Sequence, residues 1–524
     1  MRLSLTTALL TTILAAPSLS AQALDQTMVP RGRLRLQASP IFWSWDTRFG
    51  RAADGSESTE RLGDDLTDPT GLALFPGIPT LTQIVRQVTG DGAYDPVLGP
   101  TDGRITQEMT RIEFGGDIGV FDWLTIGAVV PWVRNRTAVD LIFRPDTING
   151  NLGLNPTITD PGGVNAFLVS TMSADAAAQS NATSMCSGGP SAPCTSAQAL
   201  ATRTSGLNSS LQAAYAASPF FPLVGTTEGT ALAQVATTLS ADLTAAGLPG
   251  LSALTLANET LAADGLALLP TVAGANIDAL LPLQTRKGLW AVGDVEVSAR
   301  LRLLDNLTPS PGAPEPGFGY RVTGSFLARL ATGTQEDPDV LLDIGTGDRQ
   351  MDLQGGLAAQ VRLGGRIGLA VSGYYASQGS TTLVKRVAPP ELAMPPAATR
   401  REVKWQPGTF VGFDLSPALH LSSTLTLAGE YRFFQKRRDS FELVSPDQTL
   451  DPVVLALESG VKIHQVGGGL RYDTVEPWLR GDASRPIELH LRLLHSLKGS
   501  GGQTPESTRI EAGIRLFRRF WGPN

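Results

Sequence analysis

The chain has 524 residues, a mean hydropathy of +0.02 and a hydrophobic fraction of 42%. Its formal net charge of −7 argues against nucleic acid as a partner, because counterion release requires a concentrated basic surface. Beyond the N-terminus there is no run of about 18 apolar residues, which argues against membrane-spanning helices. The mean hydropathy is compatible with membrane-spanning strands, because their lipid-facing apolar residues and lumen-facing polar residues alternate and cancel in the average.

Residues 1–23 have the features of a secretory signal peptide. A basic start at Met1-Arg2 precedes an apolar run from Leu3 to Ala16, and Ala21-Gln22-Ala23 fits the small-residue cleavage pattern. We therefore expect export through the Sec pathway and a mature chain that begins at Leu24.

A period of two recurs through the mature chain and predicts strands. In the clearest segment, 293–304, apolar residues alternate with charged or polar ones. The apolar set is Val295, Val297, Ala299, Leu301 and Leu303, and the opposing set is Asp294, Glu296, Ser298, Arg300 and Arg302. A helix would distribute these charges around its circumference, whereas a strand separates them onto two faces.

Similar segments predict twelve strands and an all-β fold, an antiparallel transmembrane β-barrel. The strands are expected at 33–45, 104–120, 124–142, 289–304, 318–334, 349–363, 366–378, 400–415, 421–437, 460–473, 486–497 and 508–521. An even number returns both ends of a bacterial barrel to the periplasm. Local irregularity predicts bulges near Gly324 and within 460–473.

The connections alternate broadly between long and short, as expected for outside loops and periplasmic turns. The outside connections are predicted at 47–103, 144–288, 335–348, 379–399, 438–459 and 498–507. The periplasmic ones are predicted at 121–123, 305–317, 364–365, 416–420 and 474–485. Many aromatic residues fall near predicted strand ends, which is typical of interface belts. They are Trp43, Trp45, Trp123, Trp132, Trp290, Trp405, Tyr431, Phe433, Trp478, Phe520 and Trp521.

The long insertion 144–288 separates the first barrel strands, in 24–143, from the remaining ones, in 289–524. Its alanine-rich stretches 195–217, 226–246 and 251–269 predict a largely helical cap or an inward-folding plug, and a disordered loop is the alternative. Cys186 and Cys194 are expected to form one local disulfide in an exported protein. The segment from Leu72 to Val88 could likewise enter the lumen.

Two stretches carry a family resemblance. The first runs from Gly116 to Gly127 and on through Val130-Pro131-Trp132-Val133, and the second combines 292–295 with 299–304. Together they resemble strands of the outer-membrane proteins of the phenol meta-cleavage-pathway family, which are distantly similar to long-chain fatty-acid transporter barrels. The last strand ends near Phe520-Trp521 and resembles the C-terminal signal read by the barrel-assembly machinery. The resemblance implies uptake of small hydrophobic compounds.

Charged residues on the non-lipid face are the candidate functional residues, either as a salt-bridge network that fills the lumen or as a constriction that selects permeants. The predicted lumen-lining set is Arg111, Glu113, Asp117, Asp294, Glu296, Arg300, Arg302, Arg321, Arg329, Arg362, Glu430, Arg432, Arg492, Glu511 and Arg515. No catalytic constellation, metal-ligand spacing or cofactor motif is expected. His495-Ser496 would point to opposite faces of a strand and so cannot form a dyad.

Two hypotheses for function follow. The first is an outer-membrane channel or transporter for small, hydrophobic compounds. The alternative is a structural or adhesion barrel whose function lies in the 144–288 cap. The expected partners are the lipid bilayer, the barrel-assembly machinery and a small-molecule permeant.

Overall fold

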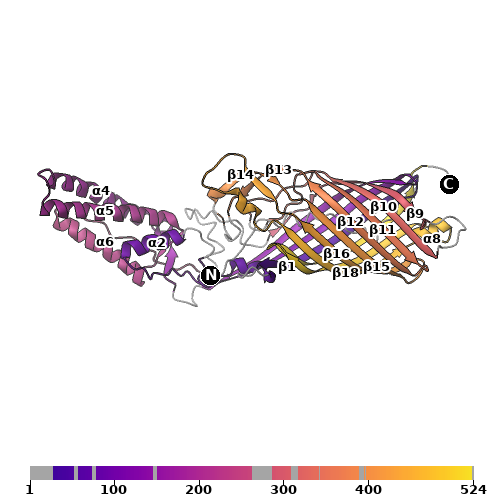
Figure 1. Ribbon diagram of the computed structural model, residues 1–524. Coiled ribbons are helices and arrows are strands. Elements are labelled where there is room, and N and C mark those ends of the chain that lie inside the picture. The colour runs from indigo at the N-terminus through magenta and orange to yellow at the C-terminus, as the bar shows by residue number, and fades with distance from the viewer. Residues whose placement is uncertain are drawn as a thin grey trace.

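The computed structural model describes residues 28–51, 57–72, 78–144, 150–262, 286–308, 317–340, 343–388, 395 and 397–521. The predicted signal peptide lies outside these ranges. Twelve strands of the described chain form one closed antiparallel barrel, because β3 pairs with β1 at the end of the sheet order (Figure 1). The barrel prediction is thereby confirmed.

The barrel strands follow in chain order and pair mostly with their sequence neighbours. They are β1 (Arg33–Arg51), β3 (Thr101–Phe121), β4 (Leu124–Phe143), β9 (Glu296–Asp305), β10 (Phe318–Arg329), β11 (Asp352–Leu363), β12 (Ile367–Gln378), β15 (Phe410–His420), β16 (Leu425–Lys436), β18 (Val461–Asp473), β19 (Ile487–Ser500) and β20 (Thr504–Arg519). Three short strands pair with barrel strands outside this ring. The strand β2 (Glu57–Arg61) pairs with β1, and β7 (Arg286–Lys287) and β8 (Ala291–Val292) pair with β4.

The barrel is apolar outside and polar inside, the reverse of a soluble protein. Outward-facing Phe42, Phe114 and Leu491 are 49%, 52% and 56% exposed, whereas inward-facing Arg35 and Glu488 are 0% and 1% exposed. Such an outer surface is stable only against lipid tails, so the barrel lies in the outer membrane. None of the described helices is both long enough and apolar enough to cross a bilayer.

The two predicted bulges occur on neighbouring strands. β10 pairs with β11 without interruption, while the pairing with β9 skips Leu303 opposite Val322 and Thr323. Likewise β18 keeps its alternation throughout, and the extra residue is Leu497 of β19. The apolar residues of β18 change sides because Val461 and Ile463 belong to an apolar part of the inner wall.

The prediction of one strand at 400–415 is wrong. Residues 400–406 form β14 (Arg400–Gln406), which pairs with β13 (Thr381–Arg386) and β17 (Ser440–Leu443) in a separate sheet. Pro407 has no N–H to continue the ladder, and Gly408 lies directly against the backbone of Arg437. The barrel strand β15 therefore starts at Phe410, and its periplasmic turn is 421–424 instead of 416–420. The 3₁₀ turns η5 (Ala397–Thr399) and η6 (Pro452–Ala456) accompany this outer sheet.

The turn between β11 and β12 comprises 364–366, one residue more than the predicted 364–365. Gly364 and Gly365 have φ values of +56° and +68°, a left-handed conformation that glycine adopts without strain.

The insertion forms a helical cap that projects beyond the outer end of the barrel (Figure 1). Its elements are β5 (Leu152–Leu154), α3 (Pro156–Thr159), α4 (Pro161–Met185), α5 (Ala192–Ala217), β6 (Phe220–Pro222) and α6 (Thr227–Ala245). The α4–α5 hairpin carries the bonded cysteines Cys186 and Cys194 at its tip. Residues 251–262 contain no helix, contrary to the prediction for 251–269, and the rest of that stretch lies outside the described residues.

The helix α2 (Ile78–Thr89) belongs to the cap. Its buried residues Leu81 and Val85 join the same apolar core as α5 and α6. The described part of the 72–88 segment therefore does not enter the lumen. The inward-folding alternative for the described insertion is likewise wrong, because α4, α5 and α6 bury their apolar faces against one another outside the barrel.

Aromatic residues occupy the lipid-facing rim at the periplasmic end. Phe121 stacks on Trp123, and Phe520 contacts Trp521 edge to face. The prediction for Trp43 and Trp45 is wrong, since both share the inward face of β1 with Arg35 and Trp45 is 3% exposed. The Arg509 guanidinium lies 4.6 Å from the Trp43 ring centroid within the lumen.

Candidate functional site

The inner wall carries the charged side chains because alternate residues of each strand share one face. Every residue of the predicted lumen-lining set lies on this wall or at its ends, and most are buried. The structure joins most of them into ion pairs, so the two interpretations of the charges, structural network and selective constriction, concern largely the same residues.

One series of ion pairs crosses β3, β9, β10 and β11. The Arg111 Nε donates to Glu113 at 2.8 Å, and its Nη2 donates to Glu296 at 3.2 Å. The Arg329 Nε lies 3.6 Å from the same Oε1 of Glu296. The Arg329 Nη1 continues the series by donating to Asp352 at 2.9 Å. Each arginine thus lies between two carboxylates.

Asp117 forms a second cluster nearer the periplasm. Its carboxylate accepts two hydrogen bonds from Arg35, at 2.9 and 2.7 Å, and one from Arg300. The three residues come from β3, β1 and β9, and all are buried. This carboxylate therefore ties together strands that are far apart in the sequence.

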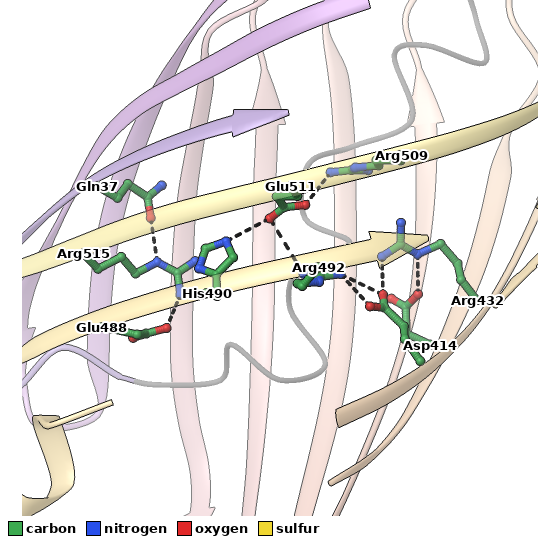
Figure 2. A network of polar contacts seen from close by, with 10 residues as sticks. Gln37, Asp414, Arg432, Glu488, His490, Arg492, Arg509, Glu511 and Arg515 are labelled. Atoms are coloured by element: carbon green, nitrogen blue, oxygen red, sulfur yellow. Dashed lines mark hydrogen bonds and ion pairs between the residues drawn. The ribbon is translucent and has the colours of Figure 1, made fainter. Parts of the chain in front are cut away.

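A third series spans β15, β16, β19 and β20 (Figure 2). Arg432 donates to Asp414 at 2.8 Å and to Glu430 at 2.7 Å. Arg492 then donates to Glu430 at 2.8 Å and lies 3.8 Å from Glu511. Figure 2 shows the side chains of Asp414, Arg432, Arg492 and Glu511 gathered inside the barrel.

Two further carboxylates of this wall each contact several basic side chains. Glu511 accepts from Arg509 at 2.9 Å and lies 3.2 Å from His490 Nε2. Glu488 accepts from Arg515 at 2.6 Å and lies 3.3 Å from Arg471.

The other predicted residues lie nearer the two openings. Arg302 and Arg321 lie 3.4 and 3.2 Å from Asp305 near the periplasmic end. At the outer end, Asp294 accepts backbone N–H groups of Thr332, Gly333 and Asp348, so it holds a loop instead of joining the ion-pair series.

Several charged residues of the wall were not predicted. They are Arg35, Asp352, Asp414, Arg471, Glu488, His490 and Arg509. Most of them could have been found from the alternation of the strands, because each lies two residues from a predicted inward residue or continues its pattern. Glu488 and His490, for example, alternate with the outward-facing Leu489 and Leu491. Asp414 was hidden by the misplaced strand at 400–415.

Above the charged series, part of the inner wall is apolar. Ala376, Phe410, Phe434, Val461 and Ile463 form one buried cluster. Tyr374 packs against it, and its ring meets Phe410 edge to face with centroids 6.4 Å apart.

Outer loops gather around Arg48 at the extracellular end. Arg48 lies 2.8 Å from Asp65 of η2 (Leu62–Leu66) and 2.7 Å from Glu60. It also donates to Gln503 at 3.1 Å, which in turn donates to Glu458. Burial raises the pKa of the Asp65 carboxyl to about 7, although Arg48 opposes the shift.

The periplasmic opening is narrowed by α8 (Val475–Arg480) and by the start of the described chain. Val29, Val475 and Phe517 form a buried apolar cluster there, and the Val29 N–H donates to Thr125 at 3.1 Å. Glu476 accepts two hydrogen bonds from Arg362 across the opening, at 2.9 and 3.1 Å. Burial opposes ionisation of Glu476, but Arg362 outweighs it and holds the pKa of that carboxyl below its usual value.

A cavity of about 390 Å³ lies between α8, the periplasmic turns and the third ion-pair series. Among its lining residues are Arg362, Arg366, Arg471, Arg480 and Arg515. The inner wall thus contains an apolar cluster, the third ion-pair series and an arginine-lined cavity in succession.

His495 and Ser496 point to opposite faces of β19, as the strand parity predicts. Ser496 is buried and lies 3.3 Å from Ser507, whereas His495 is exposed and lies 3.0 Å from Thr508. The two side chains do not form a nucleophile–base pair.

No family model matches the sequence, and a search of curated proteins found no match. The fold is similar to an outer-membrane channel from Pseudomonas putida F1, with 8% identity, a TM-score of 0.41 and coverage of 94% of this chain and 98% of that chain. It is also similar to the Pseudomonas putida toluene transporter TodX, with 10% identity, a TM-score of 0.26 and coverage of 99% and 96%. A Pseudomonas aeruginosa FadL homologue matches with 8% identity, a TM-score of 0.24 and coverage of 93% and 90%.

Proposed function

We propose that the chain is an outer-membrane channel that lets small compounds, including hydrophobic ones, cross the lumen of the barrel. The observation that supports this function is the layered inner wall. An apolar cluster around Phe410 and Phe434 lies above paired charges, and a cavity of about 390 Å³ lies below them.

This arrangement fits passage better than a purely structural role. A barrel that only anchors a cap needs no cavity, and small barrels fill their interior with side chains. The apolar cluster can contact a hydrophobic body, and the charges of the inner wall can select what passes.

The test is ion conductance of the purified, refolded mature chain in a planar bilayer. The companion variant replaces residues 156–258 by a short Gly-Ser linker. Its ends are close already, since the Leu154 N–H donates to the Glu259 carbonyl at 3.3 Å. Folding of both proteins is checked by their heat-dependent mobility in gels.

Because the described cap projects away from the barrel, we expect discrete conductance steps of similar size from both proteins. Silence from both folded proteins would overturn the channel proposal. Function would then be sought in the cap, as the adhesion hypothesis requires.

We also propose that the barrel-assembly machinery recognises the last strand, β20. It pairs with β1 to close the barrel, and exposed Phe520 and Trp521 follow it at the rim.

A further inference from the structure

The periplasmic cavity is formed by parts of the barrel that are distant in sequence. The turns 364–366 and 421–424 bound it on one side and α8 bounds it on another, while β18, β19 and β20 supply its inner wall. The lining therefore depends on closure of the barrel and not on a single loop.

Cations outnumber carboxylates in this lining. Seven arginines line the cavity within the described chain, namely Arg321, Arg362, Arg366, Arg471, Arg480, Arg492 and Arg515. The lining carboxylates are Asp473, Glu476 and Glu488, while Arg321 and Arg492 also pair with Asp305, Glu430 and Glu511 outside the lining. An anion in the cavity would lie directly against guanidinium groups, and the exposed Arg366 among them has no ion pair within the described chain.

The carboxylates are shared between arginines. Glu488 holds both Arg471 and Arg515. A guanidinium has five N–H donors, and the buried Nε of Arg362 has no hydrogen-bond partner among the described residues, so it can donate to a further carboxylate. Arg366 is exposed in the turn and has no side-chain ion pair among the described residues.

The volume and the remaining lining favour an organic ligand. A volume of about 390 Å³ is much larger than an inorganic ion needs and lies within the range of small-molecule sites. Ala418, Ala428 and Leu421 contribute apolar surface to the same cavity.

We propose that this cavity binds a small organic carboxylate. Its anionic group lies among the arginines on the periplasmic side of the third ion-pair series. The inference rests on the proposed channel function, because the lumen is the route by which the ligand reaches the cavity from outside. It also specifies the permeant class as compounds with a compact apolar body and one carboxylate.

The test uses sodium benzoate as the probe and calorimetric titration of the refolded, detergent-solubilised full barrel. The uncharged isostere benzamide is titrated in parallel. The test variant is Arg366→Gln/Arg480→Gln, and the charge-matched control is Arg104→Gln/Arg518→Gln, because Arg104 and Arg518 are exposed and do not line the cavity.

We expect the wild type and the control to bind benzoate and not benzamide. The test variant should bind benzoate at least about tenfold more weakly, because a lost charge-assisted hydrogen bond is worth on the order of tenfold in affinity. If the double variant fails to fold by gel mobility, the single variant Arg366→Gln at the exposed turn serves instead.

Equal affinity in test and control variants, equal binding of benzamide, or no binding of benzoate would each overturn the proposal. Bilayer recordings separate this failure from failure of the channel proposal. Conductance without benzoate binding removes the site and keeps the channel, whereas benzoate binding without conductance removes the channel and keeps the site.

Discussion

Asp117→Asn should destabilise the barrel, because this carboxylate holds two buried arginines from different strands. Asp117 accepts two hydrogen bonds from Arg35 and one from Arg300. The amide keeps one acceptor oxygen and introduces an NH₂ group that faces guanidinium donors. Two buried cations would then lose the counter-charge that Asp117 supplies.

The expected loss follows from these contacts. A hydrogen bond to a charged group contributes about 1.5–3 kcal/mol, and breaking a buried ion pair costs about 3–5 kcal/mol. Since the amide oxygen still accepts one bond, we expect the free energy of unfolding to fall by about 3 kcal/mol.

The assay is urea unfolding of the refolded barrel in lipid vesicles, followed by tryptophan fluorescence. Asp140→Asn is the matched control, because Asp140 is exposed on β4. A change of less than about 0.5 kcal/mol for Asp117→Asn, equal to that of the control, would refute the view that the lumen charges support the fold.

Three other predictions concern the loops, the cap and the last strand. The folded-state pKa of Asp65, about 7, lies above its ordinary value of 3.8, so its contribution to stability is lost as pH rises from about 4 to 7. Asp65→Asn should therefore gain in Tm relative to the wild type across that window, and a constant difference would contradict the shift. Replacing Cys186 and Cys194 by alanine should make the cap more protease-sensitive by releasing about 2–3 kcal/mol of loop restraint, while the gel mobility of the barrel stays unchanged. Replacing Phe520 and Trp521 by serine should lower the amount of assembled barrel in the outer membrane, and normal amounts would argue against the assembly signal.

Strand positions could be predicted because lipid and lumen impose opposite chemistry on alternate residues. Val297 and Leu301 face outward and Glu296 and Arg300 face inward, and this difference is written directly in the sequence. The segment at 400–415 failed because a second sheet outside the membrane also alternates. Pro407-Gly408 was the local sign of the break.

Partners within the lumen could not be predicted in the same way. Arg35 meets Asp117 because the register of β1 on β3 places the two residues directly opposite each other, and the long connection between these strands does not fix that register in the sequence. The helix α4 was missed because Asp160-Pro161 suggested a turn. In the structure, Asp160 caps the helix by accepting the Gly163 N–H, and Pro161 occupies its first turn.

The most direct test of the central claim is the swelling of proteoliposomes that contain the refolded mature chain in an isosmotic solution of a small neutral sugar. A channel lets the sugar enter, so the account predicts swelling faster than that of protein-free liposomes and of liposomes with heat-denatured chain. Equal rates in all three, with the barrel folded by gel mobility, would contradict it.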